Sequence, residues 1–67
     1  RPDYRGAPPR YTILRDGVFV GTLYKEPDYQ KHPWRVEDFF GRIKIVDGAD
    51  CFATLKVAMS AARKVFK

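Results

Sequence analysis

The chain has few of the residues from which small proteins build covalent or metal cross-links. Its 67 residues include one cysteine, Cys51, and one histidine, His32. A single cysteine cannot form an internal disulfide, and two side chains cannot complete a structural zinc site. We therefore expect no metal and no cofactor. Stability should come from packing of the apolar side chains, which make up 45% of the sequence.

Long apolar segments are also missing. A charged residue interrupts each apolar run within a few positions, whereas a membrane helix needs about 20 apolar residues. No stretch resembles a secretory signal, and the lack of paired cysteines is typical of a reducing compartment. These features predict a cytoplasmic protein with no membrane partner.

The sequence offers little from which a catalytic site could be built. Cys51 and His32 are the only thiol–imidazole candidates, and the local sequence supplies neither an orienting third group nor oxyanion donors. Cys51 is more simply explained as a small buried apolar residue. Glu37 and Asp38 are adjacent, so in a strand they point to opposite faces and cannot act together as a pair of catalytic carboxylates. The five glycines are scattered and form no phosphate-binding loop. We predict a protein that is not an enzyme and has no small-molecule substrate.

Alternating polar and apolar residues predict a β-hairpin. Arg10–Arg15 and Val18–Tyr24 flank Asp16-Gly17, a strong signal for a two-residue turn. In that register Arg15 lies opposite Val18, Ile13 opposite Val20 and Tyr11 opposite Thr22. One face of the hairpin would then carry Tyr11, Ile13, Val18, Val20 and Tyr24, and the other Thr12, Leu14, Phe19, Gly21 and Leu23.

Two further segments extend the predicted sheet. Trp34–Phe40 reads as a third strand, and Arg42–Val46, after a turn at Gly41, as a fourth strand or a continuation of the third. In the fourth segment Ile45 would point inward and Val46 outward. Residues 1–9 contain prolines that exclude a central strand, so we expect an extended arm there, ahead of a single domain of residues 10–67.

The C-terminal segment predicts an amphipathic helix. Thr54 can cap it, although a start at Asp50 is an alternative. The apolar stripe has helical spacing and consists of Leu55, Ala58, Met59, Ala62, Val65 and Phe66. The expected fold is α+β, with an antiparallel sheet of three to four strands and one C-terminal helix packed on one face (β-β-β(-β)-α).

With the helix on one face, the other face becomes the candidate binding surface. Arginine and lysine side chains can grip phosphates or read guanine edges. The leading hypothesis is DNA binding by sheet residues Arg10, Thr12, Arg35, Arg42 and Lys44, with Arg1 and Arg5 helping from the arm. Charges on the solvent face of a sheet are also expected without any ligand.

The alternative hypothesis is a small protein–protein interaction domain, such as an inhibitor or adaptor, or a homodimer. Large apolar side chains are expected on the same outer face, which is unusual for a solvated surface. The interface would use Leu14, Phe19, Leu23 and Phe39. A register that is wrong by one residue would exchange the two faces and remove part of this patch.

Several short motifs are spread over most of the chain: Tyr4-Arg5-Gly6, Arg15-Asp16-Gly17, Gly21-Thr22, Trp34, and Phe52-Ala53-Thr54-Leu55 with Ala58, Ala61 and Ala62. Together they resemble the AP2-type DNA-binding module and the N-terminal domains of some phage and transposon integrases. The resemblance implies a three-stranded sheet on one helix, whose open face enters the major groove, in a phage or mobile-element protein. The chain departs from it in the early position of Gly21-Thr22, the additional segment Arg42–Val46 and the more apolar outer face.

Overall fold

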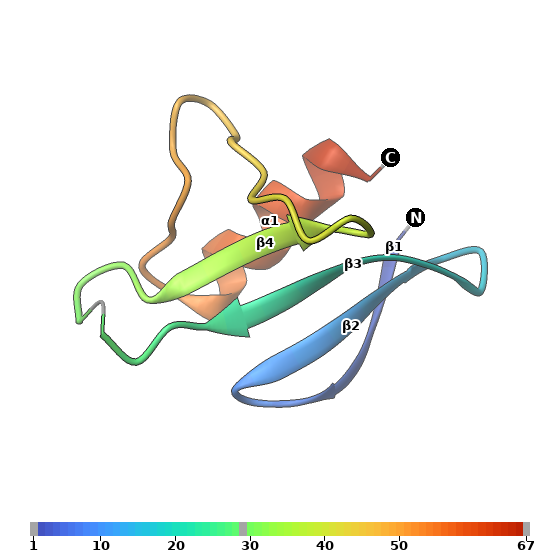
Figure 1. The fold of residues 1–67 in the computed structure, drawn as a ribbon, viewed down its shortest axis with the longest axis horizontal. Coiled ribbons are helices and arrows are strands. Elements are labelled where there is room, and N and C mark those ends of the chain that lie inside the picture. The colour runs from blue at the N-terminus through green and yellow to red at the C-terminus, as the bar shows by residue number, and fades with distance from the viewer. Residues whose placement is uncertain (1, 29, 67) are drawn as a thin grey trace.

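The computed structural model describes residues 2–28 and 30–66. In this part of the chain the elements are β1 (Pro2–Ala7), β2 (Arg10–Arg15), β3 (Val18–Lys25), β4 (Trp34–Asp38) and α1 (Leu55–Val65). The strands pair antiparallel in chain order as a four-stranded meander (Figure 1). This confirms the predicted α+β fold class. Among the described residues, no helix has the length and apolar character that crossing a membrane requires.

The N-terminal segment belongs to the sheet. Pro2–Ala7 pairs with the whole of β2, from Pro2 opposite Arg15 to Ala7 opposite Arg10. Prolines exclude a central strand but are tolerated at an edge, where one side of the backbone makes no ladder bonds. The prediction of a separate arm over residues 1–9 is therefore wrong, and the domain includes β1.

The turn between β2 and β3 is the predicted one. Asp16 and Gly17 both have positive φ, at 53° and 80°, as the favoured two-residue hairpin turn requires. Arg15 lies opposite Val18. The sequence therefore predicted the start of the hairpin register correctly.

A β-bulge then changes the face assignment of β3. Ile13 lies opposite Gly21 instead of Val20, because Val20 is an extra residue on β3. Every later residue of β3 consequently points to the face opposite to the predicted one. Leu23 is fully buried, and Tyr24 lies on the outer face, opposite Arg10. The placement of Leu23 on an exposed interface is wrong for this reason.

The loop after β4 covers the outer edge of that strand. The segment Arg42–Val46 forms isolated bridges and is not a full fourth strand; one bridge joins Ile43 to Glu37. Farther along the same edge, Phe52 exchanges two backbone hydrogen bonds with Trp34, at 3.0 and 2.8 Å. The chain's own residues thus satisfy much of the backbone of β4 that faces away from β3.

The helix packs on one face of the sheet through small side chains. Its first turn is capped by Thr54, whose Oγ1 accepts a hydrogen bond from the Val57 amide at 3.2 Å, so the start at Thr54 is confirmed over Asp50. The buried residues of α1 are Ala58, Ala61 and Ala62. Figure 1 shows α1 behind β3 and β4, with the other face of the sheet open.

The core lies between the helix and the inner face of the sheet. Ile13, Leu23 and Val36 are its largest fully buried side chains. Val46 is also buried, whereas Ile45 is 70% exposed, the reverse of their predicted orientation, because the segment bends past β4 instead of pairing regularly with it. The remaining buried side chains are Trp34, Phe52, Phe66 and the three helix alanines.

Candidate functional site

The open face of the sheet carries two polar rows that cross all four strands. Residues directly opposite one another in neighbouring strands share a face, so the register defines both rows. One row contains Arg5, Thr12, Thr22 and Glu37, and the other Ala7, Arg10, Tyr24 and Arg35. The structure therefore brings four of the predicted nucleic-acid contacts together on one face: Arg5, Arg10, Thr12 and Arg35.

Tyr24 is the aromatic centre of the second row. The Arg10 guanidinium carbon lies 5.3 Å from the centroid of its ring, within the range of a cation–π contact. Partial burial raises the pKa of the Tyr24 phenol, and the charge and hydrogen bond of Glu37 raise it further. The raised pKa keeps the Tyr24 hydroxyl protonated at neutral pH. The regular alternation of the sequence predicts Tyr24 on the core face, which is wrong because of the bulge in β3.

A cluster of exposed phenyl rings lies at the other end of the open face. We define it as the phenylalanine patch, formed by Phe19, Phe39 and Phe40. The ring of Phe39 is 5.5 Å from that of Phe19 and 5.5 Å from that of Phe40, centroid to centroid. The exposed fractions of the three residues are 44%, 57% and 81% in sequence order. Phe40 was not predicted as a site residue, although its position beside Gly41 indicated a solvent-facing turn.

Asp38 holds the turn that presents this patch. Its Oδ1 accepts hydrogen bonds from the amides of Phe40 and Arg42, both at 2.9 Å, and its Oδ2 lies 3.7 Å from Lys44 Nζ. The Arg42 amide bond lowers the pKa of the Asp38 carboxyl most strongly, and the Phe40 amide and the charges of Lys44 and Arg42 lower it further. Several donors therefore favour the ionised carboxylate of Asp38.

The pH dependence of this turn follows from that shift. Because the pKa of Asp38 is lower in the folded protein than its ordinary 3.8, its stabilisation of the turn is complete above that pH and is lost as the pH falls through the folded value. We expect the amide resonances of Phe40 and Arg42 to shift together at a midpoint below 3.8 in an NMR titration. In the Asp38→Asn variant this shared step should vanish. A midpoint above 3.8 would contradict the assignment.

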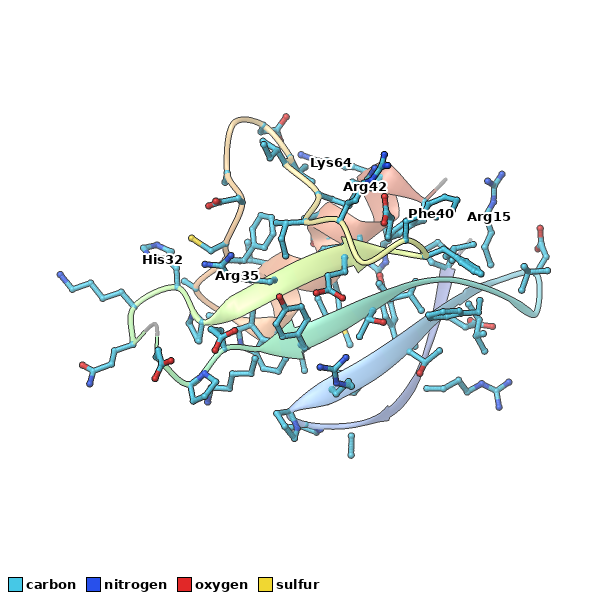
Figure 2. The ribbon with its side chains drawn as sticks, in the orientation of Figure 1. Arg15, His32, Arg35, Phe40, Arg42 and Lys64 are labelled. Carbon is cyan, nitrogen blue, oxygen red and sulfur yellow. The ribbon has the colours of Figure 1, made fainter. Side chains whose placement is uncertain are left out.

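The remaining predicted residues are divided between the patch and other places. Arg42 lies beside the patch, with its guanidinium carbon 5.8 Å from the centroid of Phe40 (Figure 2). Lys44 is paired with Asp38, so neither Arg42 nor Lys44 belongs to the regular sheet face on which we placed them. Leu14 is half-buried opposite Phe19. Arg1 lies outside the described residues.

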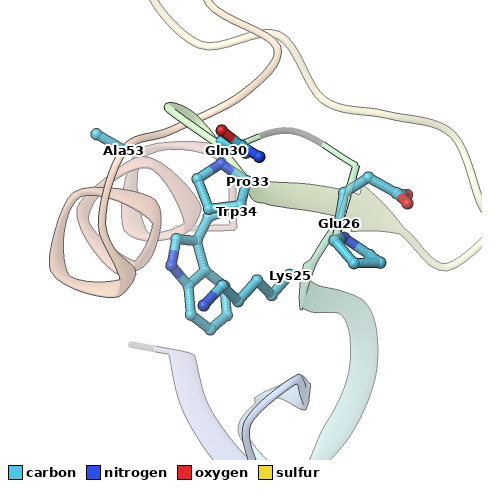
Figure 3. A pocket seen from close by; sticks show the side chains of 7 residues that line it. Lys25, Glu26, Gln30, Pro33, Trp34 and Ala53 are labelled. Carbon is cyan, nitrogen blue, oxygen red and sulfur yellow. The ribbon is translucent and has the colours of Figure 1, made fainter.

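A pocket of about 380 Å³ lies at the far end of β4 from the patch. Figure 3 shows Lys25 beside the indole of Trp34, with Glu26 directed away from it. Among the described lining residues, the amine of Lys25 and the carboxylate of Glu26 therefore point in different directions. The other lining residues are Pro27, Gln30, Pro33 and Ala53.

The candidate residues for nucleophilic chemistry are Cys51 and His32. Partial burial raises the pKa of the Cys51 thiol, and a hydrogen bond to Asp50 and the negative charge of Asp50 raise it further, which disfavours the reactive thiolate. His32 is exposed in the loop before β4. In the described ranges, 2–28 and 30–66, no group of three or more His, Cys, Asp or Glu side chains is placed to hold a metal ion.

Comparison with known proteins adds no relative: no family model matches the chain, and no curated protein or solved structure matches it significantly. The open sheet face and the phenylalanine patch are therefore interpreted from their own chemistry.

Proposed function

We propose that this domain binds nucleic acid, with DNA as the leading candidate, through the open face of its sheet. The observation that carries the proposal is the pairing of an arginine with an aromatic ring at two places along this surface: Arg10 with Tyr24 on the sheet, and Arg42 with Phe40 in the turn after β4. Guanidinium groups grip phosphates through paired hydrogen bonds, and aromatic rings stack on bases.

The distribution of charge supports the same function. Arg5 lies opposite Thr12, and Tyr24 lies between Arg10 and Arg35 on the described part of that face, where the acidic residues of the paired strands are Asp3 and Glu37. The whole chain has a net charge of +5, which attracts polyanions at long range. Presentation of a sheet face to DNA is an established docking geometry, and the resemblance to sheet-plus-helix DNA-binding modules points the same way.

Removal of phosphate-binding side chains should reduce both affinity and its salt dependence. We expect the Arg5→Ala/Arg10→Ala variant to bind fluorescein-labelled DNA more weakly in an anisotropy titration. Its log K should also fall less steeply with log salt. The magnitude of the slope should be smaller by about 0.9 for each duplex phosphate that the variant no longer neutralises. Both arginines are exposed, so the variant should keep its fold.

Two variants serve as controls for that measurement. Lys56→Ala removes one positive charge from an exposed position on the helix, away from the open sheet face, and should leave the salt slope unchanged. Glu37→Gln removes a carboxylate from the middle of the proposed surface and should strengthen binding. Failure of the unmodified protein to bind any nucleic acid at low salt would refute the proposed function.

Protein association through the phenylalanine patch is the alternative, and exposure of its rings is the observation that favours it. At about 200 Å² for each phenylalanine, the exposed fractions correspond to roughly 350 Å². A stable interface buries about 800 Å² on each partner. With Leu23 in the core, the patch is smaller than this alternative requires. Light scattering that shows a dimer, abolished by Phe19→Asp, would nevertheless favour it.

A further inference from the structure

We infer that the phenylalanine patch stacks on unpaired bases, so that the domain prefers single-stranded to duplex nucleic acid. The inference rests on the proposed function and specifies the form of nucleic acid that the surface selects. Phe39 and Phe40 are stacked with an interplanar angle of 30°, and Phe19 is tilted by 40° against Phe39.

These rings can meet only certain parts of a nucleic acid. In a duplex, neighbouring base pairs cover the faces of each base and only base edges are open in the grooves. An unpaired base exposes its whole face, and stacking on an aromatic ring tolerates any sequence. Phe40, at 81% exposure, offers the largest accessible ring of the patch. The patch is therefore suited to a base that has left the duplex stack.

The patch is also continuous with the proposed phosphate contacts. Phe19 lies on the same outer face of β3 as Tyr24, five residues away along the strand, which is at most about 16 Å at about 3.3 Å per residue because the bulge shortens the path. Figure 2 shows Arg35 and Phe40 toward opposite ends of β4. A strand whose phosphates contact Arg10 and Arg35 can continue along the sheet to place a base on the rings.

Arg42 gives the patch its own phosphate contact. Its guanidinium carbon is 5.8 Å from the centroid of Phe40, near the outer limit of about 6 Å for a cation–π interaction. The side chain is exposed and can move from the ring to a phosphate while a base takes its place. The backbone of the turn stays fixed by the hydrogen bonds of Asp38. The combination of a ring, a neighbouring cation and a rigid turn favours a nucleotide over an apolar protein surface.

The test measures the binding of two fluorescein-labelled probes by anisotropy at low salt. One probe is an oligothymidine of about 16 nucleotides, and the other is a duplex of the same length. This length is the upper end of the site size of a small single-strand-binding fold. We expect tighter binding of the oligothymidine. Phe40→Ala and Phe39→Ala should each weaken its binding by at least about fivefold, the lower end of the effect of removing one stacking ring. The same substitutions should change the affinity for the duplex by less than about twofold, because the bases of a duplex cannot stack on these rings.

Three further variants control for packing and folding. Ile45→Ala removes an exposed apolar side chain of the same loop without a ring and should leave both affinities unchanged. Phe40→Tyr should retain binding of the oligothymidine. Phe40→Trp should also retain it, and its exposed indole should lose fluorescence when the base stacks. Far-UV circular dichroism of each variant checks the fold.

The outcomes separate this inference from the proposed function. Equal affinity for the two probes, or unchanged binding of Phe40→Ala, would overturn the single-strand preference while nucleic-acid binding itself stands. Absence of binding to either probe would refute both. A dimer of the unmodified protein that dissociates on Phe40→Ala would overturn the inference in favour of self-association through the patch.

Discussion

Substitution of Gly21 by alanine will destabilise the domain more than substitution of a glycine in an open turn. A Cβ atom at this position would lie 2.2 Å from the backbone oxygen of Glu37 and 2.8 Å from the ring of Phe66. The backbone of β4 cannot move away without breaking its pairing with β3, so the cost should reach or exceed about 3 kcal/mol, the upper end for overpacking. Because a domain of this size has on the order of 3–5 kcal/mol of stability, the variant should lose most of its free energy of unfolding.

Urea denaturation followed by tryptophan fluorescence measures this effect, because Trp34 is buried in the core. Gly48→Ala is the matched control. A Cβ there would meet nothing within 4 Å, but φ is +81°, so the cost should be limited to about 1–2 kcal/mol for a left-handed backbone. Equal destabilisation by the two substitutions would contradict the close approach of Phe66 and β4 at Gly21.

Leu23→Ala is expected to cost about 2–5 kcal/mol, as is usual for a leucine removed from a closed core. Leu23 is 0% exposed and belongs to the cluster that includes Ile13 and Val36. This prediction depends directly on the bulge at Val20, because an unbulged strand would place Leu23 in solvent. Chemical denaturation of the variant therefore tests the register as well as the packing.

Leu14→Ala provides the comparison. Leu14 is a half-buried leucine on the outer face, opposite Phe19, and its truncation should cost less than about 1 kcal/mol, close to the range for surface substitutions. The two variants remove the same atoms from neighbouring strands. If they had the same effect on the free energy of unfolding, the assignment of inner and outer faces would be wrong.

The sequence predicted those elements whose signals are local. The Asp16-Gly17 turn, the alternation that begins β4 at Trp34, and the helix after Thr54 each follow from a few neighbouring residues. The fold class followed from these elements, because an amphipathic helix of this kind needs an apolar sheet face to cover.

The bulge and the edge strand were not predicted because they depend on distant contacts. The extra residue at Val20 places Gly21 beneath Phe66, a residue near the other end of the chain. A glycine within a strand often marks a bulge, so Gly21 was the available signal. β1 was not predicted because its prolines argue against a strand, although an edge strand that pairs only with β2 tolerates them. The phenylalanine patch likewise depends on the turn after β4, which brings Phe39 onto Phe19.

The covered edge of β4 has a consequence for the behaviour of the protein at high concentration. Sheets polymerise by adding strands at an unpaired margin, and within residues 2–28 and 30–66 the margin left for this is β1. There Pro2 has no N–H to donate, and Asp3 and Arg5 are charged side chains of the kind that protects edge strands from further pairing. In the described part of the chain, β1 is therefore the edge open to strand addition, and its proline and charged side chains disfavour that addition.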